Sequence, residues 1–479
     1  MDSHLDNEYR QQRLANLKEL ETRGVAPSGQ SFARDGRIAE VRPAFAEGNT
    51  LRAAGRLVAK RDMGKSVFGH LQDASGKFQV YLKKDAMSEA AFDAFRFVDL
   101  GDHVGVEGEC FTTRTGEPTL KVASWTLLGK ALQVPPEKWH GLTDIELRYR
   151  KRYLDLIANP DVCSVFRRRA AIVRGIRAFL AGRGFEEVET PMMQPVAGGA
   201  AARPFETFYN ALNCPMFLRI APELYLKRLM VGGMDKVFEL NRNFRNEGLD
   251  RSHNPEFTML EIYEAYGDVR SMKALIQDLI VTVAQDVMGT LQVGTPERPI
   301  DLTPPWREAT YAELVRETAG ADWDTLDVPA ARAKAAALGL EIDPAWGKPE
   351  ITHEVYEKLV EKSLRNPTFV MRVPADLIPL AKLCADDPSC VDVFELVIDG
   401  KEVAPAYSEL NDPVEQRRRL EHQAAGEAQK IDEDFLEALE YGMPPAGGMG
   451  VGIDRLVMIL TGQESIRDVV LFPQMKPKD

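Results

Sequence analysis

The sequence predicts an α+β protein in which a small β-barrel precedes a larger domain built on an antiparallel sheet. The first observation is a series of short strand-like runs between about 49 and 130, separated by turns that contain glycine. The second is the stretch 239–266, which has the pattern of a strand, a charged loop and a second strand. A chain of 479 residues is long enough for two or three such domains.

Turn signals and hydrophobic periodicity divide the chain into successive segments. Five strand-like runs with a helical insert near 86–97 predict a barrel of the OB type. Before it, Leu14, Leu17 and Leu20 recur at helical spacing, and Gly24 ends that helix. The expected segments are an N-terminal helical extension at 1–48, the barrel at 49–135, a proline-containing linker at 136–160, and a sheet domain at 161–479 with an alanine-rich helical insertion at about 270–365.

Composition indicates where the protein is located but says little about what it binds. The N-terminus lacks the charged start and apolar run of a secretory signal, and no window holds the roughly 18 apolar residues of a membrane span. The five cysteines lack the paired spacing of a zinc site, so we expect reduced thiols, a cytoplasmic location and no structural zinc. The formal net charge of −13 does not argue for RNA, although a basic face can coexist with an acidic bulk.

The stretch 239–266 and the segment GGMGVGIDRLVMILTG carry residues suited to a nucleoside triphosphate. The guanidinium of Arg245 has the planar donor fork that fits phosphate and carboxylate. Phe257 offers a flat face to a purine, and Arg455 can cover the other face by a cation–π contact. The glycines before Arg455 predict a turn that lets the backbone approach a ligand. A solvated loop on a sheet edge would show the same charged tip, whereas a dinucleotide fingerprint is disfavoured because its later acidic residue is missing.

Two carboxylates are expected to lie close together on one hairpin. Glu395 and Glu402 are seven residues apart, on two strand-like runs joined by the turn IDGK. Mg²⁺ prefers hard oxygen ligands and is commonly held by one or two protein carboxylates together with phosphate oxygens. The pair therefore suits a metal ion bound against a triphosphate, although two exposed strand acids would give the same pattern.

Several long segments resemble those of bacterial class II lysyl-tRNA synthetases and occur in that family's order. The resemblance extends from about Leu51 to the last residues. The segments that carry it are PMMQPVAGGAAARPFETFYNAL, RIAPELYLKRLMVGG, ELNRNFRNEGLDRSHNPEFTMLEIYEAY, EVAPAYSELNDPVEQRRR and GGMGVGIDRLVMILTGQESIRDVVLFPQMKP.

The resemblance implies an enzyme that activates L-lysine with ATP to lysyl-adenylate and transfers the lysyl group to the 3′ end of tRNA(Lys), releasing AMP and pyrophosphate. It also implies about three Mg²⁺ ions, held in part by Glu395 and Glu402, and a homodimer formed through the helix at 161–182 and the strand that follows. The residues that it assigns to ATP are Arg245, Glu247, His253, Phe257, Gly452 and Arg455, of which all but Phe257 and Gly452 are expected to be catalytic.

A site selective for lysine needs a buried carboxylate at the depth of the side-chain ammonium. Glu409 is the expected partner of that ammonium, with Tyr263 beside it, and Glu223 with the carbonyl of Gly199 is expected to bind the α-amine. One position departs from the family: Pro405 stands where Asn is usual, and it offers neither an amide side chain nor a backbone donor, so we expect a compensating contact. The remaining residues expected in this pocket are Arg245, Glu261 and Tyr407.

The barrel resembles the anticodon-binding domain of the same family. Phe68 and Phe78 have side chains that stack on unpaired bases, and the amide of Gln79 can read a Watson–Crick edge. Arg61 lies just before a strand and can contact backbone phosphate. A phenylalanine on a strand is also commonly a core residue, and only the resemblance raises Phe68 and Gln79 above that alternative.

Three other kinds of protein share parts of this pattern. An aspartyl- or asparaginyl-tRNA synthetase needs a cation in its amino-acid pocket, and the acids Glu261 and Glu409 argue against it. A shortened relative that lysylates a translation factor normally lacks the barrel. A catalytically silent RNA-binding protein would not need the arginines and the paired acids.

Overall fold

The computed structural model describes residues 3–29, 31–136, 142–378, 380–424 and 431–477. Within it the chain forms two compact units, 1–143 and 144–479, each of which has its own core. None of the helices in these described ranges combines the length and the apolar character that crossing a membrane requires.

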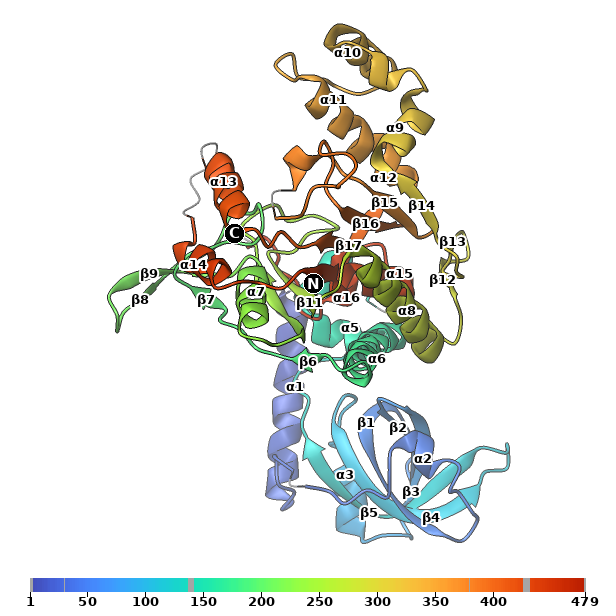
Figure 1. Ribbon diagram of the computed structural model, residues 1–479. Coiled ribbons are helices and arrows are strands. Elements are labelled where there is room, and N and C mark those ends of the chain that lie inside the picture. Colours follow the sequence, from blue (N-terminus) through green and yellow to red (C-terminus); the bar gives the residue numbers. More distant parts are fainter. Residues whose placement is uncertain (1–2, 30, 137–141, 379, 425–430, 478–479) are drawn as a thin grey trace. The chain divides into compact units, whose positions relative to one another are not determined.

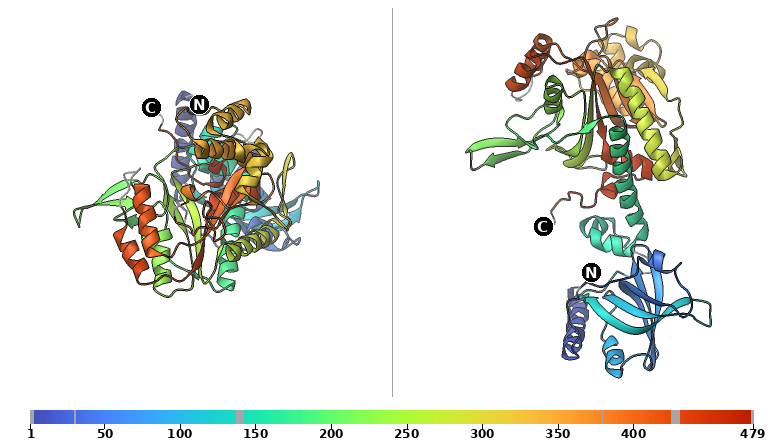
Figure 2. Two further views of the ribbon diagram at one scale, coloured as in Figure 1. Left: turned by 45° about the horizontal axis from the view of Figure 1, so that its top comes forward. Right: turned by 60° about the horizontal axis from the view of Figure 1, so that its bottom comes forward.

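The N-terminal unit is a closed five-stranded barrel, as the sequence predicts (Figure 1). Neighbouring strands follow the order β1-β2-β3-β5-β4, and only β3 and β5 are parallel. Helix α1 lies along the barrel (Figure 2), where Arg13 donates a hydrogen bond to the carbonyl of Ala131 over 2.8 Å. The elements are α1 (Ser3–Thr22), α2 (Ile38–Val41), β1 (Thr50–Asp62), β2 (Ser66–Asp73), β3 (Gly76–Lys83), α3 (Glu89–Phe95), β4 (His103–Thr112) and β5 (Pro118–Gly129).

Alternation along the barrel strands decides which side chains are inside. In β2, Val67 is fully buried while Phe68 is only partly covered, and in β3 Phe78 is 2% exposed. Phe78 packs in the barrel core, so the prediction that it stacks on bases is wrong. Its neighbour Gln79 faces outward because successive strand residues point to opposite faces.

The second unit is built on an eight-stranded sheet in the order β14-β15-β16-β17-β18-β11-β10-β6. All neighbouring pairs are antiparallel except β14 with β15 and β6 with β10 at the two edges. The antiparallel hairpin expected at 239–266 is present next to the short edge strand β6. The strands are β6 (Glu186–Glu187), β10 (Lys236–Phe244), β11 (Glu256–Ala265), β14 (Arg307–Thr310), β15 (Thr368–Met371), β16 (Val393–Ile398), β17 (Lys401–Ser408) and β18 (Ala446–Gly452).

Three helices cover one face of this sheet and form the main core with it (Figure 1). They are α6 (Pro160–Gly182), α8 (Val269–Met288) and α15 (Ile453–Thr461). The glycine-rich segment before α15 is the strand β18 rather than the predicted turn. It lies between β17 and β11. The side chains of Tyr263 on β11 and of Glu409, which follows β17, lie over its backbone at Gly448.

The region expected as one helical insertion at about 270–365 consists of several parts. Helix α8 belongs to the main core, and the hairpin of β12 (Gln292–Thr295) and β13 (Arg298–Asp301) follows it. A separate core around the fully buried Trp323 gathers the later helices. These are α9 (Tyr311–Ala319), α10 (Val328–Ala337), α11 (Lys348–Val355) and α12 (Glu361–Ser363), with single turns η1 (Trp323–Thr325) and η2 (Tyr356–Val360).

The segment expected as a linker at 136–160 becomes helical from Ile145, while 137–141 lie outside the described residues. It contains α4 (Ile145–Arg150) and α5 (Arg152–Ala158). Arg152 is buried, pairs with Asp155 over 2.5 Å and donates to the carbonyls of Arg467 and Leu471. These contacts tie α5 to the C-terminal segment of the same unit, so this part of the chain is an integral element of the sheet domain.

Of the remaining elements, α16 packs in the main core, whereas α7 and α14 share a separate core with residues of β10 and β11. β8 and β9 form a hairpin that projects from the rest of this unit (Figure 1). The bounds are β7 (Met193–Gln194), β8 (Glu206–Tyr209), β9 (Cys214–Leu218), α7 (Glu223–Val231), η3 (Ala375–Leu377), α13 (Pro413–Ala424), α14 (Glu433–Glu440) and α16 (Ile466–Val469).

Candidate active site and nucleic-acid surface

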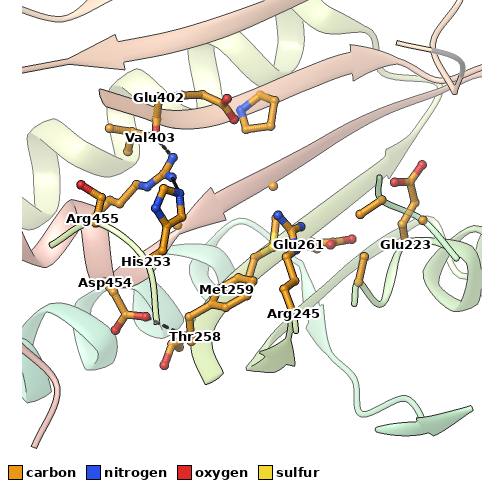
Figure 3. A pocket seen from close by; sticks show the side chains of 18 of the residues that line it. Glu223, Arg245, His253, Thr258, Met259, Glu261, Glu402, Val403, Asp454 and Arg455 are labelled. Atoms are coloured by element: carbon orange, nitrogen blue, oxygen red, sulfur yellow. Dashed lines mark hydrogen bonds between the residues drawn. The ribbon is translucent and has the colours of Figure 1, made fainter. Parts of the chain in front are cut away.

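A cavity of about 360 Å³ opens over the centre of the sheet, where β10, β11, β17 and β18 lie side by side. Its two ends differ in charge (Figure 3). Arg455, His253 and Glu402 lie at one end, Glu223 lies at the other, and Arg245 and Glu261 lie between them. The predicted residues that line the cavity are Gly199, Glu223, Arg245, Glu247, His253, Phe257, Glu261, Tyr263, Glu402, Tyr407, Gly452 and Arg455.

Arg245 is the cation at the middle of the cavity. It follows β10, and its backbone N–H donates to the carbonyl of Pro255 over 2.9 Å, which closes the hairpin loop. Its guanidinium carbon lies 5.2 Å from the centre of the Phe257 ring. Burial lowers the pKa of Arg245, and the charge of Glu247 opposes that shift. Its buried Nε has no hydrogen-bond partner within the described protein, so a donor is available to an anionic ligand.

A chain of polar contacts holds the other arginine at the far end of the cavity. Asp250 accepts two backbone hydrogen bonds in the loop, and its carboxylate lies 2.8 Å from His253 Nδ1. His253 Nε2 lies 3.3 Å from Arg455, which also donates to the carbonyl of Glu402 over 2.7 Å. Arg455 is therefore fixed beside His253. The predicted stacking of Arg455 over a purine that contacts Phe257 stays a prediction.

Two buried acids, Glu223 and Glu261, lie toward the opposite end of the cavity. Glu223 begins α7 and is 6% exposed, and Glu261 on β11 is 3% exposed. The hydroxyl of Tyr263 donates to Glu261 over 3.2 Å. Burial raises the pKa of Glu261 well above its usual value, and the charge of Glu223 raises it further. Gly199 lies against Glu223 with φ of +86°, a conformation that favours glycine.

Glu409, the predicted partner of a substrate ammonium, does not line the cavity itself. It is fully buried, and Lys227 Nζ lies 2.5 Å from its carboxylate. Both Glu409 and Tyr263, which lines the cavity, lie against Gly448. A Cβ on Gly448 would overlap Glu409 Oε1 and lie 2.6 Å from Tyr263 Cε1. Glycine is required at this point of β18 because these side chains cross directly over its backbone.

Glu395 and Glu402 influence each other electrostatically, as expected for a pair on one hairpin. In the β16–β17 register Glu395 lies opposite Pro405, and a bulge between Leu396 and Val397 shifts the pairing near Glu402. Burial and the negative charge of Glu402 raise the pKa of Glu395 to about 8. Two acids that repel each other are a donor set that suits a divalent cation. Among the described residues no group of three or more His, Cys, Asp or Glu side chains forms a complete metal site.

Pro405 lines the cavity in the middle of β17. The ladder between β17 and β18 begins one residue later, at Ala406 paired with Met449, so the missing N–H of proline leaves no gap within that ladder. Tyr407 follows on the same face, and burial raises its pKa well above the usual value. Gly452 differs from Gly448, because an added Cβ there would meet protein atoms only at 3.7 Å or more.

On the barrel the structure gathers three aromatic rings on the outer face. The Phe68 and Tyr81 rings are 4.5 Å apart between centroids, and Tyr81 and Phe111 are 5.8 Å apart. Gln79 lies on the same strand as Tyr81, and its side-chain oxygen accepts from Thr119 over 2.7 Å, which leaves the amide nitrogen as a donor. Arg61 lies opposite Phe68 in the β1–β2 register and is exposed.

Sequence reasoning missed several residues that complete these sites. Tyr81 is readable from strand alternation with Gln79, and Lys227 is readable from its spacing of four from Glu223. No local signal identifies Glu361, whose carboxylate accepts from the backbone of Glu402 over 3.3 Å. Asp454 was also missed: it pairs with Arg169 over 2.6 Å and accepts from the Thr258 backbone over 2.8 Å.

Comparison with known proteins agrees with this architecture. Residues 144–476 match the family described as tRNA synthetases class II (D, K and N), and residues 51–128 match the OB-fold nucleic acid binding domain. The chain is 50% identical to the lysine–tRNA ligase of Carboxydothermus hydrogenoformans over 482 residues, covering 99% of each protein. It is 50% identical to the lysine–tRNA ligase of Moorella thermoacetica over the full length of both, and 46% identical to that of Bacillus subtilis over 98% of both.

Proposed function

Because the chain belongs to the class II tRNA synthetases, in the branch that acts on aspartate, lysine or asparagine, we propose that it is a lysine–tRNA ligase. It activates L-lysine with ATP to lysyl-adenylate, releasing pyrophosphate, and transfers the lysyl group to the 3′ end of tRNA(Lys), releasing AMP. The observation that carries the choice of lysine is the acidic part of the cavity, where the carboxyl groups of Glu223 and Glu261 are both buried. Aspartate or asparagine ligation would need a cation or a neutral donor there.

The Lys227 ammonium does not supply such a cation. It is fully buried and already lies 2.7 Å from Glu223 and 2.5 Å from Glu409. A substrate carboxylate would have to displace two acids to reach it, which leaves both of them unpaired in a buried site. The pocket therefore favours an amino acid with a positively charged side chain.

The first reaction needs no protein nucleophile. A carboxylate oxygen of lysine attacks the α-phosphorus of ATP in line with the leaving pyrophosphate, which gives lysyl-adenylate. Arg245 lies between the two ends of the cavity, so its donor fork can hold the lysine carboxylate and the α-phosphate together (Figure 3). We assign Arg455 and His253 to the distal phosphates and Phe257 to the adenine, because all three line the cavity. Charge stabilisation and positioning then account for the rate.

Mg²⁺ would be held by Glu402 and Glu395, whose mutual repulsion a divalent cation relieves. When bound, it would neutralise charge on the triphosphate. The second reaction is the attack of the terminal ribose hydroxyl of tRNA on the lysyl carbonyl, which releases AMP. The aromatic strip of Phe68, Tyr81 and Phe111 and the amide of Gln79 are suited to hold unpaired anticodon bases.

We also propose that the protein acts as a homodimer in the cytoplasm. Four large apolar side chains are exposed on the segment after α6, which is unusual for a free surface. They are Met193 (53% exposed), Phe208 (53%), Tyr209 (43%) and Leu212 (67%). Light scattering should give a mass of twice 53.4 kDa, and a monomer at micromolar concentration would contradict the dimer. The five cysteines are free thiols, which fits a reducing compartment.

Pyrophosphate exchange into ATP, measured with each amino acid in turn, tests the proposed function. We expect exchange with lysine to exceed exchange with aspartate or asparagine by at least about a hundredfold, since a buried unpaired charge penalises the wrong substrate. Charging of tRNA(Lys) should follow with the same amino-acid preference. Exchange that is fastest with aspartate or asparagine would refute the assignment.

A further inference from the structure

Lys227 connects the two ends of the expected lysine pocket from inside the protein. It lies one turn after Glu223 in α7, and its side chain is fully buried. Its ammonium lies 2.7 Å from Glu223, which lines the cavity, and 2.5 Å from Glu409, which does not line it. A single cation thus pairs with two acids from distant parts of the chain. Glu223 begins α7, and Glu409 is the residue that follows β17.

Burying an ammonium is unfavourable unless nearby acids compensate for its lost hydration. Here the charges of Glu223 and Glu409 outweigh that penalty and raise the pKa of Lys227 above its usual value. Lys227 is therefore charged at neutral pH. Neither oxygen of Glu409 accepts a hydrogen bond of ordinary geometry from the described protein, despite the close ammonium, so its bonding capacity is not exhausted.

The charges of the pocket fit those of a diamino acid. Glu223 and Glu409 supply two carboxylates, which the ammonium of Lys227 holds on either side of it, while burial favours the uncharged form of Glu261. L-lysine brings two ammonium groups, and Arg245 is left to meet its carboxylate. Without Lys227, the carboxylates of Glu223 and Glu409 would have no cation between them, and their mutual repulsion would displace or protonate one of them.

We propose that Lys227 is a positioning residue that determines specificity: it sets the spacing of Glu223 and Glu409 and the net charge of the pocket, so that a substrate with two ammonium groups is bound. This inference rests on the proposed lysine ligase function. Lys227 itself does not touch substrate. A merely structural role would lower stability when Lys227 is changed but would leave the relative affinities for lysine and ATP unaltered.

The test is Lys227→Met, which keeps the length of the side chain and removes its charge. We expect the lysine KM in pyrophosphate exchange to rise at least tenfold while the ATP KM stays within twofold. The lysine concentration that gives half of the maximal thermal stabilisation should rise by the same factor, which measures binding without turnover. Lys227→Gln, which can still donate to Glu223, should show a smaller rise in the same direction.

Lys130→Met is the matched control, because Lys130 is also a buried lysine paired with two acids, Asp99 over 2.5 Å and Asp102 over 2.8 Å, in the barrel. It should lower the melting temperature and leave both KM values unchanged. A folded Lys227→Met protein whose lysine KM stays within threefold, or rises together with the ATP KM, overturns the proposal. So does the failure of both Lys227 variants to fold. Absence of lysine-dependent exchange in the unaltered protein would instead refute the proposed function.

Discussion

Substitution of Gly448 by alanine should damage lysine recognition without changing any charge. The new Cβ would overlap Glu409 Oε1, and it would lie 2.8 Å from Glu409 Cδ and 2.6 Å from Tyr263 Cε1. Carbon atoms prefer separations near 3.5–4.0 Å, so both side chains must move by roughly 1 Å. Both are buried, Tyr263 to 3% exposure and Glu409 completely, so neither can turn toward solvent.

A shift of that size at a binding group costs about a hundredfold in rate, equivalent to about 2.7 kcal/mol. We expect kcat/KM for lysine in pyrophosphate exchange to fall by about that factor, mainly through the lysine KM. The ATP KM should stay within about twofold, because Gly448 does not line the cavity. Overpacking should lower the free energy of unfolding by about 1–3 kcal/mol.

Gly182→Ala is the control, since an added Cβ at that end of α6 finds no atom within 4 Å. It should leave the kinetics and the stability close to those of the unaltered protein. If Gly448→Ala keeps its kcat/KM for lysine within threefold, then either Glu409 moves freely or the side-chain ammonium is bound elsewhere, and the reasoning fails.

Three further predictions concern single residues. Arg245→Ala should reduce exchange by at least roughly a hundredfold with the fold intact, because one preorganised charge donor contributes about 3–4 kcal/mol at the barrier; near-normal exchange would exclude this role. Burial raises the pKa of Glu409 to about 7, although Lys227 opposes the shift, so the carboxyl gains a proton as pH falls. The lysine KM should therefore rise as the pH falls from 8 to 6, by at most about tenfold for each pH unit below the pKa. Glu409→Gln should have a high lysine KM that does not show this pH dependence. Phe68→Ala and Gln79→Ala should leave exchange unchanged but lower kcat/KM for tRNA charging by roughly tenfold, since base stacking contributes about 1–3 kcal/mol; unchanged charging by a stable Gln79→Ala protein would refute base reading there.

The parts of the fold that the sequence predicted are those determined by local periodicity. The barrel strands alternate between buried and outward residues, and β10 and β11 pair along their whole length around one charged loop. The strand β18 was mistaken for a turn because its glycines carry no hydrophobic pattern. Glycine is needed at Gly448 because the side chains of Glu409 and Tyr263, from other parts of the chain, occupy the space above the backbone.

The residues of the site that could be predicted are those whose own side-chain chemistry suits a ligand. Arg245, Glu223 and Glu261 line the cavity as expected. The hidden pairing of Lys227 with Glu409 depends on a contact between elements far apart in the chain, which no spacing reveals. The limits of the helical insertion were misjudged for the same reason: α8 has the periodicity of any amphipathic helix, and only its packing assigns it to the main core.

Residue 402 acts through its main chain as well as its side chain. Its carbonyl holds Arg455 and its N–H is bound to Glu361, while the carboxylate is left to face the cavity. Since backbone groups survive any side-chain replacement, the proposed contact of Glu402 with Mg²⁺ can be removed while Arg455 keeps its anchor. Glu402→Gln thus separates the proposed metal contact from the anchoring of Arg455, because only the metal contact uses the side chain of residue 402.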